Sequence, residues 1–322
     1  MAAAKPRVIA IEEHYFDPEV KEHIAAADLT GGPAIAARLE DVGQGRIAKM
    51  DAAGIDMQVL SHGAPSVQKI AEPELAVRLA RSANDRLADT VRANPDRFAG
   101  FAMLPTAAPA AAADELERAV TRLGFKGAML HGLSNGVFLD DRRFWPIFER
   151  AEALDVPIYL HPAIPHPAVI DAYYKEYVGK YPNLLRAAWG FTVETATQGV
   201  RMVLSNVFET YPGLKIILGH FGEGLPFLLW RINMALVRDG AGPSWFRDTF
   251  CEHFWVTTSG FFSDPALLHA IQEIGIDRVL FSVDYPFVEN APGTEWAMRI
   301  PLSAADREKI LGGNATRLLK LS

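Results

Sequence analysis

Short apolar runs alternate with amphipathic stretches along the whole chain. Eight runs are continuous enough to be buried on both faces, as strands of a parallel sheet are; they cover residues 8–11, 56–60, 99–103, 127–130, 156–160, 215–218, 254–258 and 278–283. Apolar residues recur at helical spacing between them, over residues 74–94, 111–123, 144–154 and 265–274. This alternation predicts an α/β fold, a single (β/α)8 TIM-type barrel domain over residues 1–322.

Two connections are longer than the others. The segment from Leu160 to Lys215 exceeds a single crossover helix, and we interpret it as a long insertion after strand five, near the functional site. Its aromatic residues either belong to that insertion or simply pack a helix onto the barrel; they are Tyr173, Tyr174, Tyr177, Tyr181, Trp189 and Phe191. Residues 15–50 form another long loop, rich in glycine, and Asp264 is the expected N-cap of the helix at 265–274.

Composition excludes several classes of function. The 322 residues include 32 Lys and Arg against 39 Asp and Glu, a net charge of −7, and no basic stripe attracts a nucleic acid. One cysteine, Cys251, allows neither an internal disulfide nor a thiolate metal cluster. Neither a signal peptide nor a run of about 18 apolar residues is visible. We therefore expect a cytoplasmic protein with no membrane or nucleic-acid partner, in which His and carboxylate groups hold any metal.

Ionisable residues gather at the ends of four predicted strands. They are Glu12, Glu13 and His14 at the first, His161 at the fifth, His220 at the sixth and Asp284 at the eighth. Catalytic residues of (β/α)8 enzymes stand at the C-terminal ends of strands, so these positions are candidates. Side chains alternate along a strand, so Glu12 and His14 should share one face while Glu13 points to the other.

Glu12, His14, His161 and Asp284 form a candidate metal site. Two imidazoles and two carboxylates suit zinc, manganese or a similar divalent ion such as magnesium. A single His or carboxylate at a strand end is more often structural, but the convergence of three strand ends favours the metal.

His220 and Glu223 are a second candidate pair. Their spacing of three residues lets the carboxylate reach back to the imidazole, which prepares a histidine for proton transfer or orients it as a ligand. Alternatively, Glu223 is only a charge at the start of a helix.

Taken together, motifs across nearly the whole chain resemble the amidohydrolase superfamily, in its branch of aminocarboxymuconate-semialdehyde and hydroxybenzoate decarboxylases. The motifs are IEEHY at 11–15, LSHGAP at 60–65, ANDR at 83–86, DRFAG at 96–100, LHP at 160–162, LGHFGEGLP at 218–226, SVDYP at 282–286 and GNA at 313–315. In most amidohydrolases the first strand ends in the motif His-x-His. Here Glu12 takes the first position of that motif, and this Glu-x-His form resembles γ-resorcylate and 5-carboxyvanillate decarboxylases.

The resemblance implies a metal-dependent, non-oxidative decarboxylase that acts on an ortho-hydroxybenzoate. It implies one metal ion per chain, because strand four ends in His131 without the bridging Lys of binuclear members, and no organic cofactor. It assigns protonation of the ring carbon to Asp284 and the hydroxyl side of the substrate to His220 with Glu223. It also implies that the protein forms a homodimer or homotetramer. The expected substrate is a small aromatic carboxylic acid.

The sequence allows more than one role for three further residues and more than one function for the protein. Arg231 could pair with a second substrate carboxylate or phenolate, or equally form a salt bridge on its helix. From their positions after strand four, His131 and Asn135 are expected to contact ring substituents. The main rival is a metal-dependent hydrolase of lactonase type, in which a metal-bound water attacks with help from His220; a third possibility is a non-enzymatic binding protein. Glu12 favours the lyase.

Overall fold

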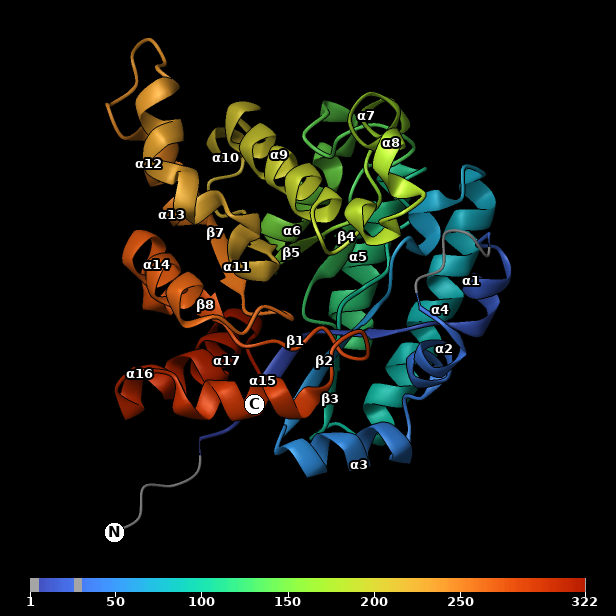
Figure 1. The fold of residues 1–322 in the computed structure, drawn as a ribbon. Coiled ribbons are helices and arrows are strands. Elements are labelled where there is room, and N and C mark those ends of the chain that lie inside the picture. Colours follow the sequence, from blue (N-terminus) through green and yellow to red (C-terminus); the bar gives the residue numbers. More distant parts are fainter. Residues whose placement is uncertain (1–5, 26–30, 322) are drawn as a thin grey trace.

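Eight parallel strands form the centre of the molecule in the computed structural model, which describes residues 6–25 and 31–321 (Figure 1). They are β1 (Ile9–Tyr15), β2 (Met57–His62), β3 (Phe98–Gly100), β4 (Ala128–His131), β5 (Ile158–His161), β6 (Ile216–Leu218), β7 (Phe254–Thr257) and β8 (Val279–Leu280). Each overlaps one of the eight predicted runs. The burial of both faces explains why the runs are continuously apolar.

The strands form two parallel sheets, of order β1-β2-β3 and β4-β5-β6-β7-β8. Backbone hydrogen bonds also cross the two gaps between the sheets. Beyond β3, Ala102 N donates to Gly127 O at 2.8 Å and Met129 N donates to Ala102 O at 3.1 Å. At the other gap, His14 N donates to Tyr285 O at 2.7 Å and Asp284 N donates to Glu12 O at 3.1 Å. The edges of the sheets are therefore bonded to one another.

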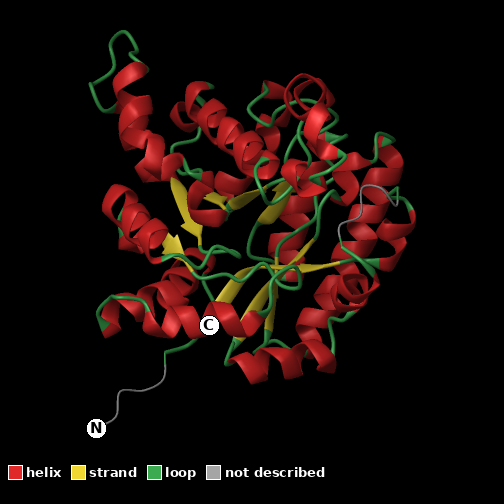
Figure 2. Cartoon of the chain, viewed as in Figure 1, coloured by secondary structure: helices red, strands yellow, loops and turns green. Residues whose placement is uncertain are grey.

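Helices surround the strands (Figure 2). Four lie where apolar spacing predicts them: α4 (Pro73–Ala93), α5 (Pro109–Leu123), α6 (Trp145–Ala153) and α14 (Asp264–Ile274). The expected N-cap of α14 is wrong by one residue, because Ser263 occupies the cap position and Asp264 is the first helical residue. The Asp264 carboxylate instead accepts a hydrogen bond from Trp296 Nε1 at 2.7 Å.

The two long connections contain several short helices. Within residues 15–50 lie α1 (Pro18–Glu22), α2 (Pro33–Glu40) and the start of α3 (Gln44–Ala53); residues 26–30 of this predicted loop lie outside the described ones. Between β5 and β6 lie α7 (Pro167–Val169), η3 (Ile170–Tyr174), α8 (Lys175–Val178), η4 (Pro182–Leu185), α9 (Gly190–Leu204) and α10 (Val207–Thr210).

The remaining elements complete the outer layer. They are η1 (Ser66–Lys69), η2 (Arg142–Phe144), α11 (His220–Glu223), α12 (Leu225–Ala235), α13 (Trp245–His253), η5 (Ile276–Arg278), α15 (Asn290–Arg299), α16 (Ala304–Glu308), η6 (Lys309–Gly313) and α17 (Asn314–Leu319). Over residues 6–25 and 31–321, every helix is too short or too polar to cross a lipid bilayer.

A β-bulge in β1 decides which side chains reach the site. Ile9 and Ile11 pack in an inner apolar cluster enclosed by the strands, whereas Ala10 packs in the outer cluster against the helices. Strict alternation would therefore send Glu13 inward. The register against β2 shifts between Ala10 and Glu13, and this extra residue turns Glu12 inward instead.

Candidate active site

Four side chains converge at the C-terminal ends of the strands. Glu12 and His14 come from β1, His161 from β5 and Asp284 from the segment after β8, and one ligand atom from each lies within 4.8 Å of the others. His161 Nε2 is 3.3 Å from Glu12 Oε1, and His14 Nε2 is 3.2 Å from Asp284 Oδ1. The structure thus brings together all four residues that the sequence suggests as metal ligands.

The polar atoms of this cluster fit a metal ion. Among the described residues, Glu12 Oε1, His14 Nε2 and Asp284 Oδ1 are buried atoms that make no hydrogen bond. Buried polar atoms without partners are rare because their desolvation is not compensated. Two imidazole nitrogens and two carboxylate oxygens at one point suit manganese or zinc. The cluster can therefore hold one divalent cation.

Hydroxyl groups anchor the second oxygen of Glu12. Tyr159 Oη and Ser259 Oγ donate hydrogen bonds to Glu12 Oε2, and Thr257 Oγ1 donates to it at 3.3 Å. Gly219 leaves room for this carboxylate, since a Cβ there would lie only 3.1 Å from Oε2. Because Oε2 is held by the protein, Oε1 is directed into the cluster.

The pKa values of the two carboxyl groups in the cluster are shifted in opposite directions. Burial opposes ionisation of Glu12, but the imidazoles of His220, His161 and His14 hold its pKa below the usual range. Burial, together with the charge of Glu12, raises the pKa of Asp284 to about 7. Burial also lowers the pKa of His14 to about 4, so its ring is neutral, as a metal ligand must be.

His220 and Glu223 lie in a left-handed stretch that follows β6. Five consecutive residues, 220–224, have positive φ, a conformation that costs energy for every residue except glycine. This turn brings Glu223 Oε1 to 2.7 Å from His220 Nδ1. Burial lowers the pKa of His220, but Glu223 and Glu12 outweigh it and raise the pKa to about 10. His220 is therefore a cation at neutral pH, with Nε2 lying 3.8 Å from Glu12 Oε1.

Exposure separates the residues that can reach a substrate from those that cannot. The side chains of Glu12 and His14 are 0% exposed, whereas those of Asp284 and His220 are 18% and 23% exposed. A bound molecule can therefore touch Asp284 and His220 directly, while Glu12 and His14 lie behind them.

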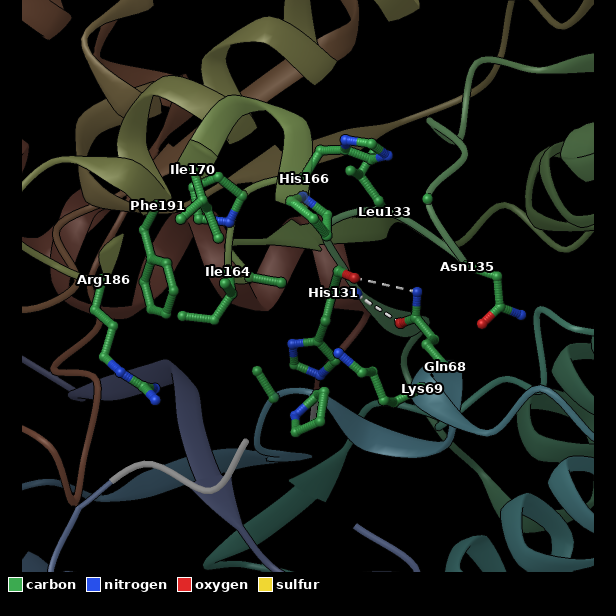
Figure 3. A pocket seen from close by; sticks show the side chains of 16 residues that line it. Gln68, Lys69, His131, Leu133, Asn135, Ile164, His166, Ile170, Arg186 and Phe191 are labelled. Atoms are coloured by element: carbon green, nitrogen blue, oxygen red, sulfur yellow. Dashed lines mark hydrogen bonds between the residues drawn. The ribbon is translucent and has the colours of Figure 1, made fainter. Parts of the chain in front are cut away.

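A cavity of about 430 Å³ opens beside His131 (Figure 3), and the four metal-ligand candidates are not among the described residues that line it. His131 and Asn135 line it, and Leu133, Ile164 and Phe191 give it apolar walls. Figure 3 shows Gln68 holding the backbone of His131; Gln68 Nε2 donates to His131 O at 3.3 Å, and His131 N donates to Gln68 Oε1 at 2.6 Å. Lys69, His166 and Arg186 also line the cavity, which therefore combines apolar walls with polar and basic groups.

His131 also contacts a metal-ligand candidate. Its Nε2 lies 2.9 Å from His62 O, which makes Nε2 the protonated nitrogen and Nδ1 an acceptor. His161 Nδ1 lies 3.0 Å from that acceptor and 2.7 Å from Pro162 O. The proton of His161 is therefore on Nδ1, which leaves the lone pair of Nε2 facing the cluster.

Arg231 lies apart from these groups. It is exposed on α12 and is absent from the described residues that line the cavity beside His131. A second, mostly apolar cavity of about 930 Å³ lies between α9, α12 and α14, and His220 and Glu223 reach it from the site. Arg231 is not among the described residues that line this cavity either.

Sequence reasoning missed the hydroxyl groups that orient the ligands. Besides Tyr159, Thr257 and Ser259 around Glu12, Ser61 Oγ lies 3.3 Å from His14 Nδ1. Tyr159 stands two residues before His161 on the same strand, so alternation alone could have placed it on the inner face. The contact with Glu12 joins residues 147 positions apart, and no local pattern predicts it.

Substitution of Tyr159 by phenylalanine is expected to weaken manganese binding by about tenfold. The hydroxyl holds Glu12 Oε2, and hydrogen bonds to a metal-binding side chain typically contribute about 10- to 100-fold to metal affinity. Isothermal titration of the metal-free protein with Mn²⁺ measures this. Tyr15→Phe is the matched control, since the buried Tyr15 hydroxyl makes no hydrogen bond within the described chain and its loss should change the affinity little. Equal affinities of Tyr159→Phe and wild type would contradict the anchoring role.

The chain belongs to the amidohydrolase family, whose model matches residues 14–321. It is 42% identical to a γ-resorcylate decarboxylase from Polaromonas sp. (strain JS666), over 98% of both chains. A crystal structure of a dihydroxybenzoic acid decarboxylase from Polaromonas sp. JS666, with bound manganese and the inhibitor 2-nitroresorcinol, superposes with a TM-score of 0.89, 41% identity and 98% coverage of both chains. The 5-carboxyvanillate decarboxylase LigW from Sphingomonas paucimobilis gives a TM-score of 0.90 at 35% identity, covering 99% of this chain and all of that one. The resemblance inferred from the motifs is confirmed.

Proposed function

We propose that this protein is a metal-dependent, non-oxidative decarboxylase of an ortho-hydroxybenzoate, of the γ-resorcylate or dihydroxybenzoate type. The observation that carries the proposal is the cluster of Glu12, His14, His161 and Asp284, with His220 and its partner Glu223 beside it. Relatives that match over nearly the whole chain carry this activity in their names, and one was crystallised with manganese.

A divalent ion held by the cluster would supply a positive charge that binds the carboxylate and adjacent phenolate oxygens of the substrate and fixes the ring. His220 Nε2 would donate a hydrogen bond to an oxygen on the hydroxyl side of the substrate, and Glu223 orients that imidazole. Asp284, the more exposed of the two cluster carboxyls, would face the ring carbon.

The proton transfer follows from these positions. Asp284 gives its proton to the ring carbon that carries the carboxylate, and a carbon–hydrogen bond forms there. The bond to the carboxylate then breaks, its electron pair returns to the ring, and carbon dioxide leaves. Asp284 ends as a carboxylate and regains a proton from solvent. No oxidant or organic cofactor is needed, because the ring gains a proton in place of carbon dioxide.

We infer one closed (β/α)8 barrel over residues 1–322, supported by the hydrogen bonds across both gaps between the sheets. The segment between Leu160 and Lys215 is proposed as the long insertion after strand five. His131 and Asn135 are proposed to contact the ring from the cavity wall. Arg231, exposed on α12, is proposed as a contact for a second anionic substrate group.

We also infer a homodimer or homotetramer in the cytoplasm. Large apolar side chains are exposed along and beyond α12, among them Phe227, Trp230 and Val237 at 75%, 67% and 87% exposure, and such surface is typical of an interface. The absence of a second cysteine from the sequence agrees with a reducing compartment. Light scattering of the purified protein would give the number of subunits.

A substrate panel tests the proposed function. Salicylate, 2,3-dihydroxybenzoate, 2,6-dihydroxybenzoate and 5-carboxyvanillate are incubated with the manganese-loaded protein and scored for carbon dioxide, beside a panel of lactones scored for hydrolysis. We expect carbon dioxide from at least one hydroxybenzoate, and the reverse carboxylation at high bicarbonate. Hydrolysis of lactones without any decarboxylation would replace the lyase by a metal-dependent hydrolase.

A further inference from the structure

Glu13 lies at the junction of β1 and β8, on the opposite face of β1 from the metal ligands. Its side chain is fully buried, and its two oxygens accept hydrogen bonds from the chain after β8. Oε1 accepts from Ser282 Oγ at 3.0 Å and from Val283 N at 2.9 Å, while Oε2 accepts from Tyr285 N at 3.1 Å. The carboxyl group therefore grips the backbone on both sides of Asp284.

The backbone groups of Glu12 and His14 on β1 also take part in this junction. Ser282 Oγ, which donates to Glu13, accepts a hydrogen bond from Glu12 N at 2.6 Å. Asp284 N donates to Glu12 O at 3.1 Å, and His14 N donates to Tyr285 O at 2.7 Å. Three of the four ligand candidates thus depend on how β1 and the end of β8 are held together.

Asp284 needs such support because its backbone is in an unfavourable conformation. Its φ is +72°, in the left-handed region that residues with a side chain rarely adopt. A conformation of this kind persists only where surrounding contacts fix it. The hydrogen bonds from Val283 and Tyr285 to Glu13 fix the residues immediately before and after it.

Arg46 strengthens the junction from the helical layer. It is fully buried on α3, and its Nη2 donates to His14 O at 2.6 Å. Its guanidinium lies over the ring of Tyr285, 4.9 Å from the centroid. Gln58 Nε2 also lies 3.4 Å from Glu13 Oε2. Glu13 is thus the centre of a buried polar network behind the cluster.

We propose that Glu13 is a positioning residue that sets the geometry of the metal ligands on β1 and β8. It does so by accepting hydrogen bonds from the backbone N–H groups on both sides of Asp284. Through Ser282 it is also linked to the backbone N–H of Glu12. The effect on catalysis rests on the proposed function, whereas the effect on metal binding does not. A merely structural Glu13 would contribute to folding but leave the metal environment unchanged.

The test compares Glu13→Gln with a matched substitution far from the cluster. Glutamine has nearly the same volume as glutamate, but its NH2 group would meet an N–H or O–H donor of residues 282–285 where a carboxyl oxygen now accepts. Glu115→Gln is the control, because Glu115 is also buried and accepts hydrogen bonds from Asn84 and Arg118 within the α4–α5 layer. Both variants remove one buried carboxyl group.

We expect Glu13→Gln to raise the dissociation constant for Mn²⁺ by 10- to 100-fold and to change the Mn²⁺ electron paramagnetic resonance spectrum. At saturating Mn²⁺, kcat should fall while KM changes little. Glu115→Gln should lower the melting temperature and leave the Mn²⁺ affinity and spectrum at wild-type values. A wild-type affinity and spectrum in Glu13→Gln would overturn the proposal, whatever its stability.

A second variant keeps the proposal testable if Glu13→Gln does not fold. Ser282→Ala removes only the hydroxyl that links Glu12 N to Glu13, and it should weaken Mn²⁺ binding by several-fold. Unchanged binding in this variant would contradict the role of the junction. Wild-type protein that binds Mn²⁺ but releases no carbon dioxide from any hydroxybenzoate would refute the proposed function, while the Mn²⁺ comparison of the variants would still test Glu13.

Discussion

Replacement of Asp284 by asparagine is expected to reduce carbon dioxide release by about 10³-fold, within the range that general acid catalysis contributes. Asparagine keeps an oxygen that can face the cluster but carries no acidic proton for the ring carbon. The side chain of Asp284 is 18% exposed and can face a bound ring, whereas that of Glu12 is fully buried. The loss should therefore appear in the chemical step.

The measurement must separate lost chemistry from lost metal. Single-turnover rates are recorded at saturating Mn²⁺, with metal content determined on the same sample. Asp140→Asn is a suitable control because Asp140 pairs with Arg201 and lies away from the cluster; it should retain wild-type rates. If Asp284→Asn retains most of its activity with a full complement of metal, Asp284 is not the proton donor.

Removal of the metal ion is expected to abolish activity and to lower the melting temperature. The described chain provides no hydrogen bonds for three buried atoms of the cluster, and carboxyl oxygens of Glu12 and Asp284 lie within 4.8 Å of each other there. A ligand at one hundred times its dissociation constant stabilises the folded state by about 2.7 kcal/mol. This corresponds to a decrease of a few degrees when the metal is withdrawn.

Dialysis against a chelator, followed by calorimetry and the decarboxylation assay, checks this expectation. Addition of Mn²⁺ or Zn²⁺ should restore the melting temperature together with the activity, and mass spectrometry should give one ion per chain. Full activity of a protein shown to be free of metal would exclude the metal-dependent mechanism. Two tightly bound ions per chain would contradict the single-ion site.

The fold was predictable because the strands are buried on both faces. Continuous apolar runs mark all eight strands, and polar residues that interrupt such a run at its end stand out. Glu12, His14, His161 and Asp284 could be named for this reason. The connection between His220 and Glu223 was also visible, since it needs only three residues of local chain.

Contacts between distant parts of the chain could not be predicted in the same way. The anchoring of Glu12 by Tyr159 and Ser259 depends on how β1, β5 and β7 face one another. The contact of His131 with His161 depends on the pairing of β4 with β5, which sets these residues side by side. The position of Arg231 in the sequence allows a substrate contact, but the sequence does not show whether the side chain is buried. The structure places it on the exposed surface of α12.

The sequence by itself determined which chemical groups are available and at which strand ends, because burial of the strands imposes a hydrophobic pattern that polar residues break. The tertiary structure alone decided how those groups are oriented. The bulge in β1 turns Glu12 inward and Glu13 outward, and the left-handed backbone at Asp284 is held by Glu13 from another strand. The physical reason is that ligand orientation depends on hydrogen bonds between residues about 270 positions apart, which leave no local pattern in the chain.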